Sequence, residues 1–368
     1  MRIALLTDWY LPRVGGIEVH VHGLARRLRD RGHDARVLTP WPGPDEVEGV
    51  PVVRLPLGLV PGLGVSLSPF ALGRVVRAAL ARGRYDVLHG HVSFGSTAAV
   101  AGGWAALRVG IPSVGTYHSV LRGLGWVYVA AQPVLRWRSW PFRATAVSEA
   151  VAVDVRRIMP EREVSLLPNA IDPEAWTGPP ADLDPAHLRL VTVSRLQRRK
   201  RVDALLRVVA GVRGAVGGTV DVTLEVLGDG PSRKALERAL GRLGLGDAVR
   251  LHGAGGPDDV RRLLRGGHVF VNTADREAFG IAALEASSCG LPVVARREGG
   301  VGSFIDDGRN GVLVSSDDEM VRALVGLATD PDRHAALRAG AAQGIPTAYT
   351  WDAVLDRHLE LYREVMEA

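Results

Sequence analysis

The chain has one cysteine and almost no lysine among its 368 residues. Because Cys289 is the single cysteine, no disulfide can form within the chain, which fits a protein of a reducing compartment. We expect Cys289 itself to be a small side chain of the core. Lys200 and Lys234 are the only lysines among 45 basic residues, so arginine supplies nearly all of the positive charge. A lysine is therefore expected where a compact point charge is wanted, as beside a phosphate.

No apolar run is long enough to cross a membrane. The longest uncharged stretch lies between Arg54 and Arg74, and its prolines exclude a membrane-spanning helix. The start, MRIALLTDWYLP, reaches Asp8 before an apolar region of signal-peptide length can form. We expect a cytoplasmic protein, either free or bound peripherally at the inner face of the membrane.

Acidic residues are scarce in one region. The net charge is +5, but residues 70–143 hold nine arginines and one acid, Asp86, and so carry +8. A basic patch this local indicates a phosphate-rich partner: anionic lipid, nucleic acid or an acidic substrate. Residues 70–86 read as a basic helix, and residues 120–143 mix arginine with tryptophan, which suits a membrane interface. The alternative is a core helix with solvated arginines. The tryptophans of that second segment are Trp126, Trp137 and Trp140.

What the chain does contain is an α/β pattern that occurs twice. Near-continuous apolar strands alternate with helical patterns, which predicts parallel sheets covered on both faces. In the first helix Val21, Leu24 and Leu28 recur at helical spacing, and Gly32 stands at the C-cap. The expected strands are residues 2–7, 34–39, 86–90, 112–116 and 143–147, then 188–194, 222–228, 249–253, 268–272, 292–295 and 311–314.

The length suggests two domains, at roughly 100–200 residues each. Residues 168–187 hold five prolines and no periodicity, so we place the linker there. We predict Rossmann-like, doubly wound domains over 1–170 and 171–349, facing each other across a cleft, with a C-terminal helix (about 350–368) that joins the first. Ligands in such sheets bind beyond the carboxyl ends of the strands.

Two short segments are suited to phosphate. Gly15 and Gly16 end the first strand-to-helix loop, where a helix N-terminus attracts anions, although any tight turn reads the same. In SRLQRRKR (194–201), Arg195 and Lys200 follow a strand, and the alternative is a solvated basic loop.

The stretch REAFGIAALEASSCGLPVV sets a carboxylate on each side of a helix start. A helix beginning near Phe279 leaves the N–H groups of Phe279, Gly280 and Ile281 free for an anion. Glu277 precedes the helix, and Glu285 lies about 12 Å further along, at roughly 1.5 Å per residue. Carboxylates accept hydrogen bonds from sugar hydroxyls, so a diphosphate with a sugar at each end, a nucleotide sugar, uses all three features. The alternative is two ordinary surface glutamates.

Taken together, these motifs resemble glycosyltransferase family 4, a class of retaining enzymes with the GT-B fold, over nearly the whole chain. The resemblance is closest to the phosphatidylinositol mannosyl- and N-acetylglucosaminyltransferase branch. EAFGIAALE matches the E-x7-E motif of the family. The other matching segments are GGIEVHVHGLARRLRDRGH, DVLHGH, TYHS, AVSEAV, PNAID, SRLQRRK and LGDGP.

The resemblance implies a hexosyltransferase that moves a hexose or N-acetylhexosamine from a UDP- or GDP-sugar to a hydroxyl acceptor, with the anomeric configuration retained. The first domain would bind the acceptor, for which an inositol lipid at an anionic membrane is one candidate, and the second the donor. Catalytic roles fall on His118, Arg195, Lys200 and Glu277. Donor-binding roles fall on Gly15, Gly16, Phe279, Gly280, Ile281 and Glu285.

Some residues depart from the family pattern. Arg201 stands where glycine usually follows the lysine, EAFG replaces EGFG, and Ser303 replaces a frequent glutamate, which leaves the donor sugar open. The Asp-x-Asp candidates, DLD (182–184) and DPD (330–332), do not follow strands into the cleft. We expect no essential metal and no cofactor, because Arg195, Lys200 and helix N-termini supply the positive charge. His89 and His91 lie on one strand face but lack a third ligand.

Three other functions stay open at this point. A nucleotide-sugar epimerase, or another enzyme with the same fold, would need no acceptor. A non-enzymatic nucleic-acid binder would use the +8 segment, although no nucleic-acid motif is visible there. A sugar-binding protein without turnover would keep the site and lack the reaction.

Overall fold

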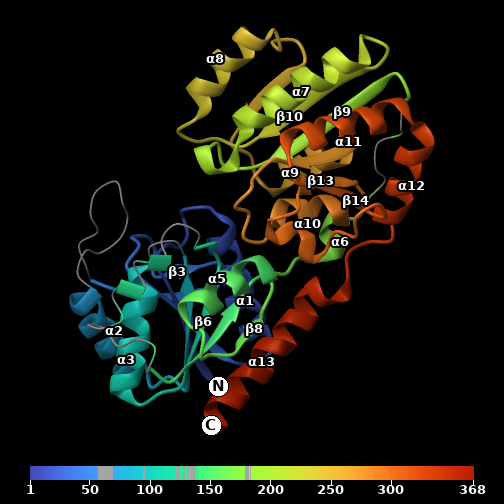
Figure 1. Ribbon diagram of the computed structural model, residues 1–368. Coiled ribbons are helices and arrows are strands. Elements are labelled where there is room, and N and C mark those ends of the chain that lie inside the picture. Colours follow the sequence, from blue (N-terminus) through green and yellow to red (C-terminus); the bar gives the residue numbers. More distant parts are fainter. Residues whose placement is uncertain are drawn as a thin grey trace. The chain divides into compact units, whose positions relative to one another are not determined.

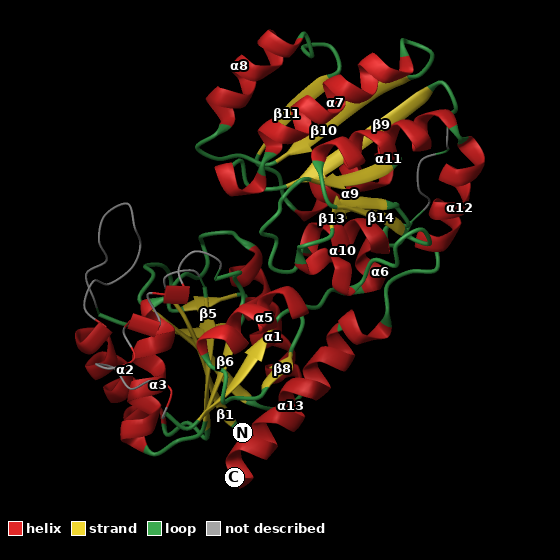
Figure 2. Ribbon diagram, in the orientation of Figure 1, coloured by secondary structure: helices red, strands yellow, loops and turns green. Residues whose placement is uncertain are grey.

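The computed structural model describes residues 1–56, 69–93, 96–121, 125–126, 129–130, 132, 138, 140–178, 182 and 184–368. Its contacts divide the chain into two compact units. The first unit is Met1–Ala170 with Trp351–Ala368, and the second unit is Ile171–Thr350. In each unit, helices lie on both faces of a sheet, shown in red and yellow in Figure 2. The predicted pair of doubly wound α/β folds is confirmed.

The sheet of the first unit has eight strands in the order β3-β4-β2-β1-β5-β6-β7-β8. Every pair is parallel except β3 with β4 at the edge. Three of these strands, β3, β4 and β8, were not predicted, because they are short and Pro51 interrupts the apolar run of β4. The bounds are β1 Arg2–Thr7, β2 Asp34–Thr39, β3 Glu46–Val47, β4 Val50–Arg54, β5 Val87–Val92, β6 Ser113–Tyr117, β7 Phe142–Ala146 and β8 Val164–Leu166.

Two hydrophobic clusters fill the space between this sheet and its helices. One is built on α1 and α13 and the other on α2 and α3, and Figure 1 shows these pairs on opposite faces. The last helix thus belongs to the first unit, where Leu355 and Tyr362 pack with Leu24 of α1. The helices are α1 Gly16–Asp30, α2 Pro69–Gly83, α3 Thr97–Val109, α5 Glu149–Ile158 and α13 Trp351–Glu367.

The sheet of the second unit is parallel throughout, in the order β11-β10-β9-β12-β13-β14. Its main cluster packs α7, α8, α11 and α12 against the strands. The strands are β9 His187–Val193, β10 Asp221–Leu227, β11 Val249–Gly253, β12 Val269–Asn272, β13 Val293–Arg296 and β14 Gly311–Val314. The helices are α6 Pro173–Trp176, η2 Arg198–Lys200, α7 Val202–Val216, α8 Arg233–Leu243, α9 Pro257–Gly266, α10 Ile281–Ser288, η3 Gly300–Ser303, α11 Asp317–Thr329, α12 Pro331–Ala341 and η4 Thr347–Tyr349.

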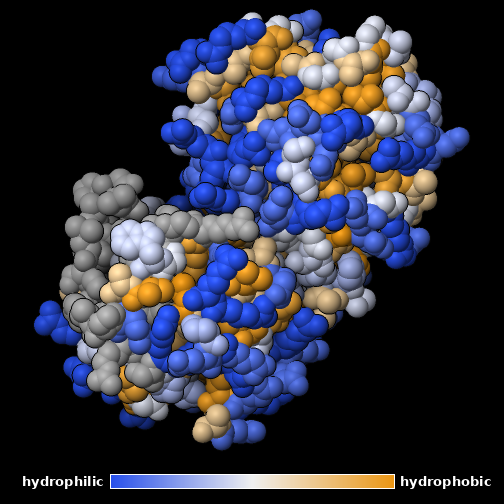
Figure 3. All heavy atoms as spheres, viewed as in Figure 1, coloured by the Kyte–Doolittle hydropathy of each residue, from blue (hydrophilic) through white to orange (hydrophobic). Residues whose placement is uncertain are grey.

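The surface carries both polar and apolar residues. Hydrophilic residues, blue in Figure 3, cover much of the visible face, and apolar residues (orange) show between them, as on most folded proteins. Over the part of the chain that the structure describes, none of the helices combines the length and the apolar character needed to cross a bilayer.

Candidate active site

A short ion pair lies at the carboxyl edge of the second unit's sheet. Lys200, in η2 after β9, places its Nζ 2.5 Å from Oε2 of Glu277, in the loop after the neighbouring strand β12. Both side chains are mostly buried, with exposed fractions of 18% and 13%. Burial raises the pKa of Glu277, but the Lys200 charge and hydrogen bond outweigh it and hold the pKa below the usual value. Glu277 is therefore ionised at neutral pH.

The start of α10 lies directly after Glu277. The helix begins at Ile281, two residues later than predicted, with Gly280 as N-cap in the left-handed region (φ 90°). A Cβ at residue 280 would come within 2.6 Å of Val301, so both conformation and space require glycine. Among the described residues, no acceptor pairs with the amides of Phe279, Gly280 or Ile281. These amides can bind an anion at the positive end of the helix.

Glu285 lies one turn further along α10 and has no ion-pair partner among the residues that the structure describes. Burial raises the pKa of its carboxyl to about 8, and the positive charge of Arg261 opposes this shift. The group is mostly protonated at neutral pH, unlike Glu277. The two glutamates thus differ in charge, which the sequence did not indicate.

Arg195 follows β9 and is exposed. The LGDGP segment fixes the backbone on either side of it: the amide of Leu196 donates to Asp229 (2.9 Å), and the amide of Ser232 donates to Leu196 (2.9 Å). Gly228 passes so close to the carbonyl of Ser194 that any Cβ would overlap it. LGDGP therefore has a structural role, because it holds the loop that carries Arg195 against the end of β10.

In the first unit, Gly15 is the N-cap of α1. The carboxylate of Glu18 reaches back over this turn, where a Cβ on Gly15 would overlap it, and accepts a hydrogen bond from Arg13 (2.7 Å). The guanidinium of Arg13 lies 4.5 Å from the ring centre of Trp9. The start of α1 that carries Gly16 thus already has a buried carboxylate, which the sequence did not reveal.

His118 follows β6 and is buried among other histidines. Its Nε2 lies 3.0 Å from Nδ1 of His91, and its backbone N–H donates to Val92. Burial lowers its pKa to about 3, with a further contribution from His358. The imidazole is neutral, so it can donate or accept one hydrogen bond but does not supply charge.

The strand pair His89 and His91 is part of this cluster. The rings stack with centres 4.3 Å apart, and His89 is held by the hydroxyls of Tyr362 (2.7 Å) and Thr116 (2.6 Å). Over the described residues, no three His, Cys, Asp or Glu side chains are grouped so that they could hold a metal ion. The Asp-x-Asp residues have other tasks: Asp184 binds His187 (2.6 Å), and Asp330 caps α12.

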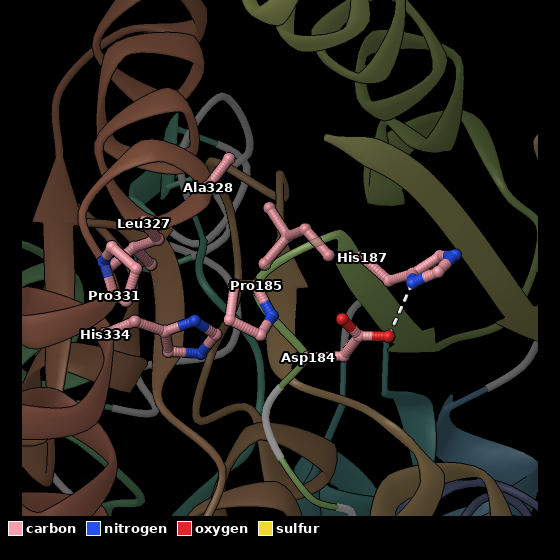
Figure 4. Close-up of a pocket in the computed structure, with 8 residues that line it drawn as sticks. Asp184, Pro185, His187, Leu327, Ala328, Pro331 and His334 are labelled. Carbon is pink, nitrogen blue, oxygen red and sulfur yellow. Dashed lines mark hydrogen bonds and ion pairs between the residues drawn. The ribbon is translucent and has the colours of Figure 1, made fainter. Parts of the chain in front are cut away.

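A small pocket at the opposite end of β9 does not fit a nucleotide. Figure 4 shows Asp184 and His187 on one side of it and His334 of α12 on the other. Its volume of about 30 Å³ has room for only a few water molecules. It lies at the amino end of the strand, whereas Lys200 lies beyond the carboxyl end.

Comparisons with known proteins cover both units. The family described as "Glycosyltransferase Family 4" matches residues 14–175, and "Glycosyl transferases group 1" matches residues 187–330. D-inositol 3-phosphate glycosyltransferase of Stackebrandtia nassauensis is 31% identical over 96% of this chain and 87% of its own length. The phosphatidylinositol N-acetylglucosaminyltransferase gpi3 protein of Schizosaccharomyces pombe is 26% identical over 98% of this chain and 80% of its own length. A human phosphatidylinositol N-acetylglucosaminyltransferase component is 31% identical over 81% of this chain, which spans only 62% of that protein.

Solved structures agree on the fold. Anabaena HepE in complex with UDP-glucose matches with a TM-score of 0.74 at 20% identity, over 100% of this chain and 98% of that chain. WaaG, a glycosyltransferase of lipopolysaccharide biosynthesis, matches with a TM-score of 0.71 at 19% identity, over 99% and 98%. Both matched halves, the relatives and this two-sheet architecture lead to one conclusion: the chain is a nucleotide-sugar-dependent glycosyltransferase of family 4, with the GT-B fold.

Proposed function

We propose that the enzyme transfers a hexose or N-acetylhexosamine from a UDP- or GDP-sugar to a hydroxyl acceptor with retention of configuration. The Lys200–Glu277 pair beside the unpaired amides of α10 carries this proposal. The diphosphate would bind Arg195, Lys200, Gly15, Gly16 and the amides of Phe279, Gly280 and Ile281. Glu277 would bind hydroxyls of the transferred sugar, Glu285 the ribose, and His118 the sugar near the reacting carbon.

The charges support this division of roles. When the bond between C1 of the sugar and the phosphate oxygen breaks, negative charge develops on the diphosphate, and Arg195, Lys200 and the α10 amides stabilise it. Glu277 is ionised and paired with Lys200. It is therefore suited to accept hydrogen bonds from sugar hydroxyls and not to attack C1. The acceptor oxygen then bonds to C1 on the same face, and its proton passes to the leaving diphosphate.

Lysine substitution tests the proposal with a matched control. Lys200→Ala and Glu277→Gln should each lower kcat by about 10²–10³, as expected for loss of a transition-state charge contact. Lys234→Ala removes the only other lysine, which is exposed on α8, and should leave kcat unchanged. Equal rates for wild type, Lys200→Ala and Glu277→Gln would refute the assigned roles.

Donor identity can be screened first. UDP, GDP and their glucose, mannose and N-acetylglucosamine derivatives should be compared by thermal shift, because a tight ligand raises the melting temperature by mass action. Incubation of the selected donor without acceptor separates an epimerase, which would still convert it, from a transferase. A gel shift at physiological salt tests the nucleic-acid alternative.

The acceptor proposal depends on α2. Its arginines are exposed and have no acidic partner among the described residues, while Leu72, Val76 and Leu80 are buried beneath them. The apolar face of α2 is used in the protein core, so the exposed arginines could bind an anionic surface through charge alone. The exposed arginines of α2 are Arg74, Arg77 and Arg82, and Arg84 follows directly after the helix. We propose that the first unit docks there to receive a lipid-linked acceptor such as an inositol lipid.

Fewer residues of the predicted basic patch are available for a membrane than the sequence suggested. Trp140 is 7% exposed and packs on α3 beside Gly103, so the prediction that it contacts a membrane is wrong. Arg143 pairs with Glu163 (3.3 Å) and Glu364 (3.6 Å). Trp126 is 69% exposed, whereas Arg122, Arg136 and Trp137 lie outside the described residues.

Flotation with vesicles tests the docking surface. At low salt, phosphatidylcholine vesicles containing phosphatidylinositol should bind the enzyme, and Arg74→Glu with Arg77→Glu should weaken binding, at about 1 kcal/mol per charge removed. Arg238→Glu with Arg242→Glu, on the exposed face of α8, is the charge-matched control. Binding that is equal in all three proteins would rule out α2.

A further inference from the structure

The loop that carries Lys200 ends in a residue with an uncommon backbone. Arg201 has φ 52° and ψ 35°, in the left-handed region, and connects η2 to the start of α7. Among the described residues, Glu48, Arg84 and Arg201 are the non-glycine residues with positive φ. A branched or long side chain is disfavoured in this region, and an outlier beside a binding residue points to a local constraint.

Two reciprocal hydrogen bonds hold this backbone in place. The hydroxyl of Thr273, at the end of β12, donates to the carbonyl of Arg201 (2.9 Å) and lies 3.4 Å from that of Lys200. In return, Nη1 of Arg201 donates to the carbonyl of Thr273 (3.3 Å). Thr273 is only 2% exposed, so these bonds lie away from water and constrain both segments.

Asp317 completes the arrangement from α11. One carboxylate oxygen binds Nη2 of Arg201 (2.8 Å), and the other binds Nη1 of Arg296 at the end of β13 (3.3 Å). Ser316 is the N-cap of the helix, so Asp317 is not needed for capping. The four residues thus join the carboxyl ends of β9, β12 and β13, which are neighbours in the sheet.

We infer that Thr273 and Asp317 are positioning residues for Lys200, which they hold through Arg201 at the place where a donor diphosphate binds. The inference builds on the proposed function. Lysine is flexible, and its charge is useful only if its backbone is fixed. The clamp, meaning Arg201, Thr273 and Asp317, sets that backbone so that Nζ stays beside Glu277. Asp317 also occupies the guanidinium of Arg201, which keeps this second cation from competing for the phosphate.

Affinities for mono- and diphosphates separate positioning from general stability. Thr273→Val and Asp317→Asn should each weaken the affinity for UDP or GDP about tenfold. The affinity for UMP or GMP should change by about twofold or less. Thr273→Ser keeps the hydroxyl and should bind like wild type. Asp203→Asn breaks the exposed Arg207–Asp203 pair (3.2 Å) on α7 and is the control. Isothermal titration on the full chain gives both constants.

The outcomes separate the two proposals. If Lys200→Ala lowers diphosphate affinity but Thr273→Val and Asp317→Asn do not, the clamp is refuted and the proposed function stands. If Lys200→Ala binds di- and monophosphates like wild type, both proposals are overturned. If Thr273→Val and Asp317→Asn weaken the affinities for diphosphate and monophosphate equally and lower the melting temperature, Thr273 and Asp317 are structural residues. That result would also refute the inference.

Discussion

The first unit buries five histidines together in its interior, whereas the second unit places two partly buried ion pairs at one edge of its sheet. The histidines come from α1, β5, the end of β6 and α13, and burial is the largest cause that lowers the pKa of each, with a further contribution from neighbouring histidines for all but His358. They are His20, His89, His91, His118 and His358. In the second unit, Lys200–Glu277 and Arg201–Asp317 remain charged pairs. The first arrangement is neutral and should respond to acid; the second is ionic, and we propose that it serves ligand binding.

The largest expected difference between the two units is the loss of folding stability in acid. A histidine whose folded pKa is lowered stabilises the fold above its unfolded pKa of about 6.5, and this stability is lost as the pH falls, because the unfolded chain takes up the proton. At pH 5.5 each of the five costs on the order of 1 kcal/mol, so together they cost several kcal/mol, which is comparable to the stability of a whole domain.

Hydrogen exchange at pH 7.5 and 5.5, corrected for intrinsic rates, should therefore show the first unit opening before the second. The second unit also has shifted histidines, since burial lowers the pKa of His268 to about 4 and lowers that of His334, so its loss should be smaller. Equal loss of protection in both units would contradict the comparison.

Replacement of the ion pair should affect catalysis far more than stability. Lys200→Met alone leaves the mostly buried Glu277 carboxylate unpaired and should cost about 1–3 kcal/mol of unfolding free energy. The double variant Lys200→Met/Glu277→Gln removes both charges and should recover most of that loss, while turnover stays at least about 10² below wild type. Urea unfolding and initial rates measure the two effects, and a double variant less stable than Lys200→Met would refute this explanation.

The smallest expected effect concerns Glu285 and is the number of protons released when a nucleotide binds. Its pKa of about 8 leaves it mostly protonated at pH 7, and hydrogen bonds from ribose hydroxyls would favour the ionised form. Nucleotide binding should then release close to one proton at pH 7 and tighten as the pH rises toward 8. Titration calorimetry in two buffers of different ionisation enthalpy detects the proton, and Glu285→Gln should abolish it. Proton release that persists in this variant would point to another group.

Much of the fold was predictable because buried parallel strands are nearly continuous apolar runs. RIALLT and HVFVN were found for that reason, whereas the short β3 and β8 and the proline-containing β4 lack such a run. The proximity of Lys200 and Glu277 was also predictable, since each lies in the segment that follows a strand of the same sheet. Their mutual contact was not, because it depends on side-chain rotamers.

The residues that sequence reasoning missed act through contacts between distant segments. Thr273 and Asp317 are 44 positions apart, counted from their residue numbers, and both contact Arg201 only because the fold brings the loop after β12 and the start of α11 to it. Arg201 carried a signal, because it replaces a glycine, but its partners did not. The histidine cluster was visible only as the pair His89 and His91, since His20 and His358 come from opposite ends of the chain.

The placement of α13 has a consequence for biosynthesis. Trp351 stacks on His20 with ring centres 5.1 Å apart, and Tyr362 hydrogen-bonds His89, so the interior of the first unit is closed by residues translated after the whole second unit. On the ribosome, the amino-terminal sheet must wait with one face covered by α1 alone until α13 emerges from the exit tunnel. A nascent chain arrested before residue 351 should therefore engage chaperones through that face, even though its second unit has already been synthesised.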